Sequence, residues 1–362
     1  MTGKADVGRF SEAVIDALAA QAGSDPLKLA AIAAKALEHG HAERAYSLAR
    51  AARSLAPADP EVASLTRAPL ASGVPPWHFG IVRDEARNAA YDAALCRAVG
   101  GGTRVLDIGA GTGLLAMMAA RAGAAAVASC EMNRAVADAA AEIVALNGFS
   151  DRIRIIAKHS TEIDPDADLG WRADVLVSEI ISNDILGQSV LPVMEDAAAR
   201  LLKPGGTMIP AGGRIRVALA HWSGLEERLP GEAAGFDISP FHRLDRVPQR
   251  LGRGDPRLTV LSDPADLFEF DFTSGGPFPA QRMKLDLRAA GRVNGIIQWI
   301  HLRLDGLAEY ENEPAPGQSS CWACLFYPLD GAADADAAAI VTVHGAHNRR
   351  TLRIWGEVGG AA

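Results

Sequence analysis

A short run of glycines between an apolar strand and an apolar helix constrains the fold of this chain more than any other feature. The run reads Val105-Leu-Asp-Ile-Gly-Ala-Gly-Thr-Gly-Leu-Leu, with glycines at Gly109, Gly111 and Gly113. Glycine lets the backbone turn tightly and come close to a ligand. A dinucleotide fingerprint would place its third glycine at position 114, which is leucine here. The run therefore predicts a strand–loop–helix ligand site of a different kind.

Two acidic residues indicate the ligand. Asp107 lies just before the glycines, and Glu131 ends the next predicted strand, 22 residues after Gly109. A carboxylate at that place can accept hydrogen bonds from both ribose hydroxyls. Leu114 together with Asp107 fits S-adenosyl-L-methionine better than a pyrophosphate. We therefore expect a methyltransferase core that binds this cofactor; a structural turn with a surface glutamate is the alternative.

Strands and helices alternate around the glycine run. We expect strands at 104–108, 126–130, 153–156 and 174–178, and helices at 114–122, 134–146 and 190–202, the last of which stops at Lys203-Pro-Gly-Gly. Strands that alternate with helices of this length indicate a parallel, doubly wound sheet. The fold class is thus α/β, with a class I, Rossmann-like methyltransferase domain over residues 76–210.

The N-terminal region, residues 1–75, is rich in alanine and leucine from position 9 to about 68 and predicts helices. Six residues fall where one tetratricopeptide repeat places its small residues, its glycine turn and its closing proline. They are Ala33, Gly40, Ala45, Ala49, Ala52 and Pro57. A free-standing solenoid needs about three repeats, so we expect these helices to lean on the next domain. A structural cap is favoured over a peptide-binding role, and residues 69–76 are a predicted linker.

After Pro210 the pattern changes to short alternating runs with frequent glycine and proline. We expect strands at 214–220, 267–272, 296–304, 324–327 and 340–343. Such a pattern is typical of an antiparallel sheet or barrel. We therefore predict a β-barrel domain over residues 211–362.

Composition narrows the function classes. The formal net charge is −8 and long basic runs are missing, so we expect no nucleic-acid partner. No apolar stretch approaches the roughly 20 residues of a membrane span, and the N-terminus lacks a signal-peptide core, so we expect a cytoplasmic protein with no membrane partner.

Cys321-Trp-Ala-Cys324 lacks a second pair for a zinc site, and no metal is expected. A redox role for these thiols is a lesser alternative.

The loop Glu179-Ile-Ile-Ser-Asn-Asp-Ile-Leu-Gly-Gln188 follows the predicted strand 174–178. It places a carboxylate at the strand end and an amide nine positions later. Downstream of a cofactor loop, this arrangement is suited to binding a planar cation. Asp184, in the same loop, is expected to be solvated.

The segment Trp77-His-Phe-Gly-Ile-Val-Arg-Asp-Glu-Ala-Arg-Asn, the glycine run, Cys130-Glu-Met and Ser178-Glu together resemble the protein arginine methyltransferase family. The resemblance is nearest to members that carry N-terminal tetratricopeptide repeats. It covers residues 77 to about 210 well and the barrel more loosely.

This resemblance implies site residues. His78 and Arg87 would belong to a helical flap over the cofactor, with Arg87 on the methionine carboxylate and also supporting Glu179. The other cofactor residues implied are Asp107, Gly109, Gly111, Gly113, Glu131, Met132, Ser160 and Thr161. The catalytic residues implied are Glu179, Gln188 and Asp84.

The chain departs from the family's pattern at two positions. The loop's second glutamate is Gln188, and the Thr-His-Trp loop reads Ser320-Cys321-Trp322, which removes the histidine that pairs with the aspartate at Asp84. The proton of the substrate would then leave to water, or Asp84 would act without a partner.

The function predicted is S-adenosylmethionine-dependent methylation of an arginine guanidinium, with free L-arginine preferred over peptidyl arginine. The alternatives are a cofactor-binding interaction protein with weak or no catalysis, and methylation of another nucleophile such as an amine. A homodimer is expected, although the stretch that matches the family's dimerisation arm, Trp222 to Gly235, is short.

Overall fold

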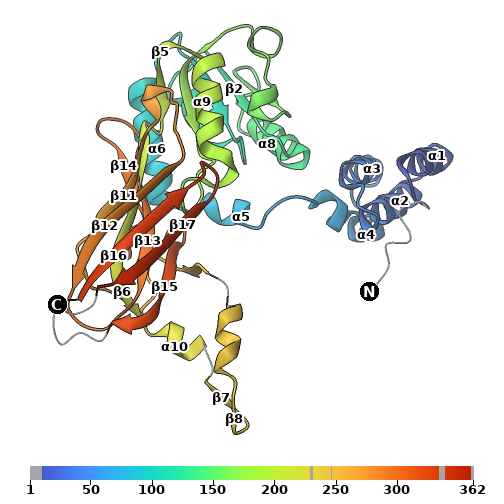
Figure 1. Ribbon diagram of the computed structural model, residues 1–362. Coiled ribbons are helices and arrows are strands. Elements are labelled where there is room, and N and C mark those ends of the chain that lie inside the picture. The colour runs from blue at the N-terminus through green and yellow to red at the C-terminus, as the bar shows by residue number, and fades with distance from the viewer. Residues whose placement is uncertain (1–9, 229–230, 246, 334–338, 360–362) are drawn as a thin grey trace.

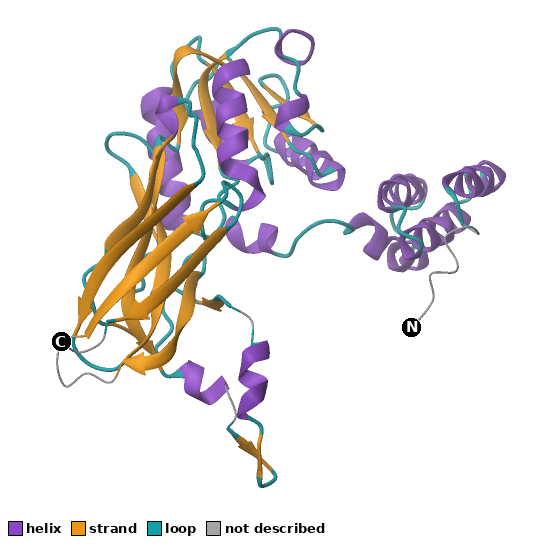
Figure 2. Cartoon of the chain, viewed as in Figure 1, coloured by secondary structure: helices purple, strands orange, loops and turns teal. Residues whose placement is uncertain are grey.

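The computed structural model describes residues 10–228, 231–245, 247–333 and 339–359 (Figure 1). A group of helices lies to one side and is joined by residues 71–76 to a layered body. In that body helices flank one sheet, and a strand-rich part extends from it (Figure 2). No helix in the described ranges is long and apolar enough to cross a membrane.

The middle of the chain forms a five-stranded sheet of order β3-β2-β1-β4-β5, in which every pair is parallel. The predicted parallel sheet is thereby confirmed. Its strands are β1 Arg104–Ile108, β2 Ala126–Cys130, β3 Ile153–Ile156, β4 Ala173–Ser178 and β5 Leu202–Ile209. Its helices and short turns are α5 Trp77–Ile81, α6 Glu85–Ala98, α7 Leu114–Arg121, α8 Arg134–Leu146, η1 Ser160–Glu162, η2 Pro165–Leu169, η3 Gly187–Ser189 and α9 Val190–Arg200.

The predicted helix 190–202 is wrong at its end, and the strand β5 was missed. The helix ends at Arg200, and the residues interpreted as its stop, Lys203-Pro-Gly-Gly, belong to β5. β5 pairs only with β4, so it is the sheet's outer strand. An edge strand tolerates proline and glycine because one side of its backbone donates to no neighbour.

The N-terminal helices are α1 Glu12–Ala22, α2 Pro26–Glu38, α3 Ala42–Leu55 and α4 Pro60–Leu70. Ala33 of α2 and Ala45, Ala49 and Ala52 of α3 are fully buried, so small side chains allow the two helices to pack closely. Gly40 makes the turn between them at φ +86°. The helical pair is confirmed, whereas its assignment to a tetratricopeptide repeat stays a prediction.

This helical region contacts the layered body through α8. The Tyr46 hydroxyl donates to the Asp138 carboxylate at 2.9 Å, and the Arg50 guanidinium donates to the same oxygen at 2.5 Å. Arg134, one turn before Asp138, also binds that carboxylate. The helices therefore lean on the next part of the chain, as expected.

The C-terminal part consists of antiparallel sheets. The larger has the order β10-β6-β13-β15-β9, with β11 also on β6 and β14 on β13; the smaller is β12-β16-β17. The strands are β6 Gly212–Trp222, β9 Gln249–Leu251, β10 Leu258–Val260, β11 Ala265–Asp271, β12 Gln281–Ala289, β13 Val293–Arg303, β14 Glu309–Glu311, β15 Cys324–Ala333, β16 Ala339–His347 and β17 Leu352–Val358.

Several of these strands are longer than predicted. The central strand β13 lies between β6 and β15 and is buried on both faces over most of its length. Its residues therefore show no alternation of apolar and polar side chains, which is the signal used to place strand ends.

The arm-like segment between β6 and β9 is also longer than expected. It continues past Gly235 to residue 248 and carries α10 Gly224–Arg228, the hairpin β7 Glu232–Ala233 and β8 Phe236–Asp237, and η4 Ser239–Leu244. Its described elements, α10, the β7–β8 hairpin and η4, project away from the sheets (Figure 1). The short hairpin and helical turns lack the apolar periodicity that would have identified them in the sequence.

Candidate active site

The carboxyl ends of β1, β2 and β4 place two carboxylates beside the glycine run. Ile108 pairs in register with Cys130 on one side and with Ser178 on the other. Glu131 and Glu179 follow those partners directly, so they leave the sheet on opposite sides of the glycines. The strand order reverses between β1 and β4, and open α/β sheets bind ligands in the crevice at such a point.

The glycine run needs glycine at its first position for two reasons. Gly109 has φ +89°, and a Cβ there would lie 2.6 Å from the Cγ2 atom of Ile180. The backbone N–H of Gly111 donates to the Glu131 carboxylate at 3.2 Å. Gly113, at φ +76°, is the N-terminal cap of α7. The run thus turns the backbone tightly and leaves space beside Glu131.

A cavity of about 590 Å³ opens at this edge of the sheet. The predicted site residues that line it are His78, Arg87, Gly109, Gly111, Glu131, Met132, Ser160, Glu179 and Gln188. Four predicted residues lie outside its lining: Asp84, Asp107, Gly113 and Thr161. Lining residues not singled out from the sequence include Lys158, His159 and Ser189. Lys158 and His159 follow the end of β3, and that position was the signal that could have identified them.

Asp107 lies behind the glycine run rather than on the cavity wall. Its side chain is fully buried and accepts a hydrogen bond from the Ser129 hydroxyl at 2.7 Å. Its other oxygen has no hydrogen-bond partner among the described residues. Burial raises the pKa of Asp107 to about 7, although the Ser129 hydrogen bond acts in the opposite direction.

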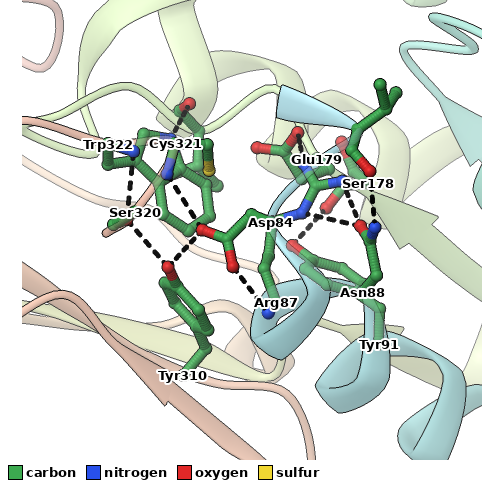
Figure 3. A network of polar contacts seen from close by, with 12 residues as sticks. Asp84, Arg87, Asn88, Tyr91, Ser178, Glu179, Tyr310, Ser320, Cys321 and Trp322 are labelled. Atoms are coloured by element: carbon green, nitrogen blue, oxygen red, sulfur yellow. Dashed lines mark hydrogen bonds and ion pairs between the residues drawn. The ribbon is translucent and has the colours of Figure 1, made fainter. Parts of the chain in front are cut away.

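A buried ion pair lines the cavity. The Arg87 guanidinium donates to one oxygen of Glu179 at 2.7 Å, and the two side chains are 4% and 8% exposed (Figure 3). Arg87 also donates to the side-chain oxygen of Asn88. The second oxygen of Glu179 has no partner among the described residues. The pair predicted between Arg87 and Glu179 is therefore confirmed.

Burial also changes the pKa of Glu179 and the kind of ligand that suits the site. Burial raises the pKa of Glu179 to about 8; the charge of Arg87 opposes this rise, and Asp107 and Asp84 add to it. A buried carboxylate with an unsatisfied oxygen gains most from a cationic donor. The site is therefore suited to a ligand that brings positive charge and N–H groups.

The segments α5 and α6 form the predicted flap beside the cavity. Trp77 and His78 stack with ring centroids 3.8 Å apart, and burial lowers the pKa of His78 despite the nearby charge of Glu131. Asp84 caps α6, because its carboxylate accepts a hydrogen bond from the Arg87 backbone N–H at 3.0 Å. The cap holds the first turn of α6, which carries Arg87.

Asp84 has a partner that the sequence did not indicate. Its second oxygen accepts hydrogen bonds from the Tyr310 hydroxyl and from the Cys321 backbone N–H, the latter at 2.9 Å (Figure 3). Neither partner is a histidine, and the route by which the substrate loses its proton stays a prediction. Burial alone raises the pKa of Asp84, but the hydrogen bonds from Tyr310, Arg87 and Cys321 outweigh it and leave the pKa below its usual value.

The loop after Glu179 has an unusual backbone. Ile185, Gln188 and Ser189 all have positive φ, at 66°, 56° and 59°. The side chain of Gln188 is exposed at the cavity wall. Asp184 is half-buried rather than solvated, because it accepts hydrogen bonds from the Ser182 hydroxyl and the Gly187 N–H. Non-glycine residues in this region of φ cost energy and cluster at functional sites.

The C-terminal sheets hold this loop in place. The Trp322 indole donates to the Ile181 carbonyl at 3.0 Å, and the Gln298 amide donates to the Asn183 carbonyl at 2.9 Å. The Ala323 backbone N–H donates to the Asn183 side chain at 2.8 Å. The loop that carries Glu179 is therefore positioned by residues that follow it by more than a hundred positions.

The two thiols of Cys321-Trp-Ala-Cys324 lie in different settings. Cys324 begins β15 and is buried, whereas Cys321 lies in the loop before it and is half-buried. Burial raises the pKa of both thiols above the usual range. Both are therefore protonated at neutral pH, which makes them weak nucleophiles and poor metal ligands. Across the described ranges no cluster of histidine, cysteine or acidic residues could hold a metal ion.

The comparisons with known proteins agree with this geometry. The chain is 36% identical over 342 residues to an arginine N(omega)-methyltransferase of Streptomyces achromogenes, covering 92% of this chain and 93% of that relative. The chain belongs to the arginine N-methyltransferase family. Chicken protein arginine N-methyltransferase 7 is 33% identical over 62% of this chain, which spans only 36% of that relative. The family model for ribosomal protein L11 methyltransferase matches residues 93–215.

Solved structures share the fold of this methyltransferase. The Trypanosoma brucei PRMT1 enzyme-prozyme heterotetrameric complex with AdoHcy superposes with a TM-score of 0.68 at 25% identity, covering 79% of this chain and 93% of that one. Arabidopsis thaliana protein arginine methyltransferase 10 has a TM-score of 0.61 at 18% identity, over 77% and 95% of the two chains.

S-adenosylmethionine is the cofactor of this methyltransferase, and the cavity fits it. Each oxygen of Glu131 accepts one backbone N–H, from Gly111 at 3.2 Å and from Asn133 at 2.9 Å. A carboxylate has about four acceptor positions, so two remain for the ribose hydroxyls. Gly109 keeps the space beside Ile180 open. Arg87 on the cavity wall can bind a carboxylate through its guanidinium.

A substitution in the glycine run tests this fit. Gly109→Ala should weaken the binding of S-adenosylhomocysteine at least tenfold in calorimetry, because the new methyl group would meet Ile180 within 2.6 Å. Gly123→Ala is the matched control, since Gly123 also has positive φ, at 106°, but nothing lies within 4 Å of its added Cβ. Equal affinities in both variants would contradict the predicted contact.

Proposed function

We propose that this methyltransferase transfers a methyl group from S-adenosylmethionine to a guanidinium nitrogen of free L-arginine. One observation carries the proposal. Glu179 lines the cavity and uses one oxygen for Arg87 at 2.7 Å, and its other oxygen is buried without a partner among the described residues. A guanidinium offers that oxygen the charge and the N–H donors that it lacks.

Glu179 binds and orients the substrate in this proposal. A guanidinium is protonated at any physiological pH, so its nitrogens are poor nucleophiles. A carboxylate that accepts two of its N–H groups draws the positive charge toward those nitrogens and leaves another better able to react. Holding the reacting atoms about 3–3.5 Å apart in line supplies much of the rate. Gln188 lies at the cavity wall, so its amide can bind the substrate without adding charge.

The remaining site residues bind the cofactor. Arg87 binds the methionine carboxylate, Glu131 binds the ribose, and Ser160 and Thr161 border the adenine. Asp107, Gly113 and Met132 shape this part of the site, and His78 covers it from the flap. The cofactor supplies a methyl group on a sulfonium: the carbon–sulfur bond breaks as a carbon–nitrogen bond forms.

The proton that the methylated nitrogen loses goes to water in this proposal. Asp84 lies outside the cavity lining, and its oxygens are already engaged by Arg87, Tyr310 and Cys321. Its pKa is held below the usual value, which makes it a weak proton acceptor. Asp84 therefore acts on the position of α6 and not on the proton.

Free arginine is preferred over peptidyl arginine for two reasons. A relative that matches 92% of this chain is named an arginine N(omega)-methyltransferase, whereas this chain spans only 38% and 36% of the protein arginine N-methyltransferase 7 relatives from Drosophila erecta and chicken. Free arginine also carries an α-carboxylate, and the amide of Gln188 can donate to it, which a glutamate could not do.

We also propose a division of the chain into three regions. Residues 1–75 form a tetratricopeptide-like region, residues 76–210 the cofactor-binding domain, and residues 211–362 a β-barrel. The barrel is supported by close packing between the two antiparallel sheets. A Cβ at Gly356 of β17 would lie 2.4 Å from Leu329 of β15, and one at Gly345 of β16 would lie 2.7 Å from Leu267 of β11.

A homodimer through the projecting segment 223–248 is part of the proposal. Phe236, Phe241 and Leu244 of this segment are 72%, 67% and 63% exposed. Large apolar side chains grouped on a projection are typical of a surface that binds another protein. A second copy of this chain is the expected partner.

Labelled methyl transfer tests the proposed function. The protein should transfer radiolabelled methyl groups to free L-arginine at least tenfold faster than to an arginine-rich peptide. Glu179→Gln should lower that turnover about a thousandfold, because removing a substrate-binding charge from a buried site costs several kcal/mol. Glu142→Gln, at an exposed position of α8, is the control and should be unaffected. Label on neither substrate would overturn the proposal.

The pH dependence follows from Glu179. Burial raises its pKa to about 8, so Glu179 takes up a proton, and the ion pair with Arg87 weakens, as the pH falls below that value. The binding of a guanidinium needs the carboxylate, so kcat/KM for arginine should rise with pH from 6 through 8 and level off above about pH 9, one unit beyond this pKa. Asp107→Asn should keep this rise and move it to lower pH, because the Asp107 charge adds to the raised pKa of Glu179. A profile that is flat from pH 6 to 9 would refute the assignment.

The projecting segment can be tested by light scattering after size exclusion. The wild-type protein should elute as a dimer at micromolar concentration. The double substitution Phe236→Asp and Phe241→Asp should give a monomer, because charged residues oppose burial of this surface. Leu146→Asp, at an equally exposed apolar position on α8, is the control. A wild-type monomer would remove this part of the proposal.

A further inference from the structure

Tyr310 joins the C-terminal sheets to the flap. It lies in β14, is 5% exposed, and follows Asp84 by 226 positions in the chain. Its hydroxyl contacts the Asp84 carboxylate and lies 2.7 Å from the Ser320 hydroxyl (Figure 3). Its ring packs edge-on against Trp322 with centroids 5.3 Å apart. No other hydroxyl group is bonded to Asp84 in the described ranges.

The direction of these hydrogen bonds is determined by the groups that take part. An ionised carboxylate can only accept, so the Tyr310 proton must point to Asp84. The Tyr310 oxygen then accepts from the Ser320 hydroxyl, whose own oxygen accepts the Trp322 backbone N–H at 3.1 Å. The result is a chain of donors that begins on the backbone of the C-terminal part and ends on Asp84. Such chains strengthen one another.

The hydrogen-bond chain continues to the ion pair between Arg87 and Glu179. The other oxygen of Asp84 caps α6 through the Arg87 N–H, and the Arg87 guanidinium binds Glu179. Trp322, at the start of the chain, also donates its indole N–H to Ile181, two residues after Glu179. The short segment that carries Ser320 and Trp322 is therefore bonded both to the loop after Glu179 and, through Tyr310, to the cap of the helix that carries Arg87.

We infer that Tyr310 is a positioning residue for methyl transfer, which holds Asp84 and thereby sets the placement of Arg87 and Glu179. Tyr310 lies outside the cavity lining, so it does not touch the substrate. Burial and the Asp84 hydrogen bond both raise the pKa of Tyr310, so it remains a hydrogen-bond donor across the physiological range. It supplies Asp84 with a partner whose charge does not change near neutral pH.

The effect on catalysis rests on the proposed function, so the test also uses a readout that does not need turnover. Tyr310→Phe should raise the amide hydrogen exchange of residues 85–91 about tenfold, because the cap on α6 loses a charge-assisted hydrogen bond. Tyr46→Phe is the matched control, since Tyr46 also donates its hydroxyl to an aspartate, Asp138, far from the site. It should leave exchange in this segment unchanged.

Kinetics give the second readout. Tyr310→Phe should lower kcat for arginine about tenfold, whereas KM for the methyl donor changes less than threefold, because Glu131 and the glycine run are untouched. Ser320→Ala should act in the same direction with a smaller loss. A merely structural role would lower the melting temperature and not separate kcat from KM. Tyr46→Phe should keep the wild-type kcat.

A double-mutant cycle decides whether Tyr310 acts through Asp84. In the Asp84→Ala background, Tyr310→Phe should cost less than twofold in kcat, because the oxygen that accepts the Tyr310 hydroxyl is already gone. Additive losses would overturn the inference, as would a kcat within twofold of wild type in the single variant. If the wild-type protein methylates no guanidine, the proposed function fails, and the exchange experiment still decides the role of Tyr310.

Discussion

The buried ion pair between Arg87 and Glu179 is the interaction on which the site depends. Two charges that are 4% and 8% exposed are costly to bury unless their remaining groups are satisfied. Arg87 meets this condition through Asn88. Glu179 meets it only in part, since one oxygen has no partner among the described residues. The proposed binding of a guanidinium rests on that unsatisfied oxygen.

The pair can exist only where two halves of the molecule meet. Glu179 leaves the parallel sheet at the end of β4, and its loop is held by Trp322 and Gln298 of the C-terminal sheets. Arg87 lies on α6, whose cap Asp84 is held by Tyr310. Each side of the pair is therefore positioned by the part of the chain that follows residue 210. A further contact within the first half, from the Tyr91 hydroxyl of α6 to the Ser178 carbonyl at 3.1 Å, joins the two elements directly.

Local patterns predicted the parallel sheet well and the antiparallel part less well, for physical reasons. β1, β2, β3 and α8 begin and end where predicted, because apolar runs there stop at polar residues or turns. The outer strand β5 was missed because its proline and glycines are tolerated only at an edge. The ends of β13 were misplaced because burial on both faces removes the alternation. The partner of Asp84 could not be found, because a contact across 226 positions leaves no local pattern.

By itself, the sequence determined the cofactor class and the residues at the strand ends, since the glycine run, Glu131 and Glu179 follow from positions close together along the chain. The tertiary structure decided how those residues work together. The register of β1 with β2 and β4 places the two glutamates on either side of the glycines. The approach of β14 to α6 supplies Tyr310 as a partner for Asp84, in a chain that has Cys321 where the family's pattern has a histidine. Hydrogen bonds depend on distance and direction in space, and only the folded chain brings these groups together.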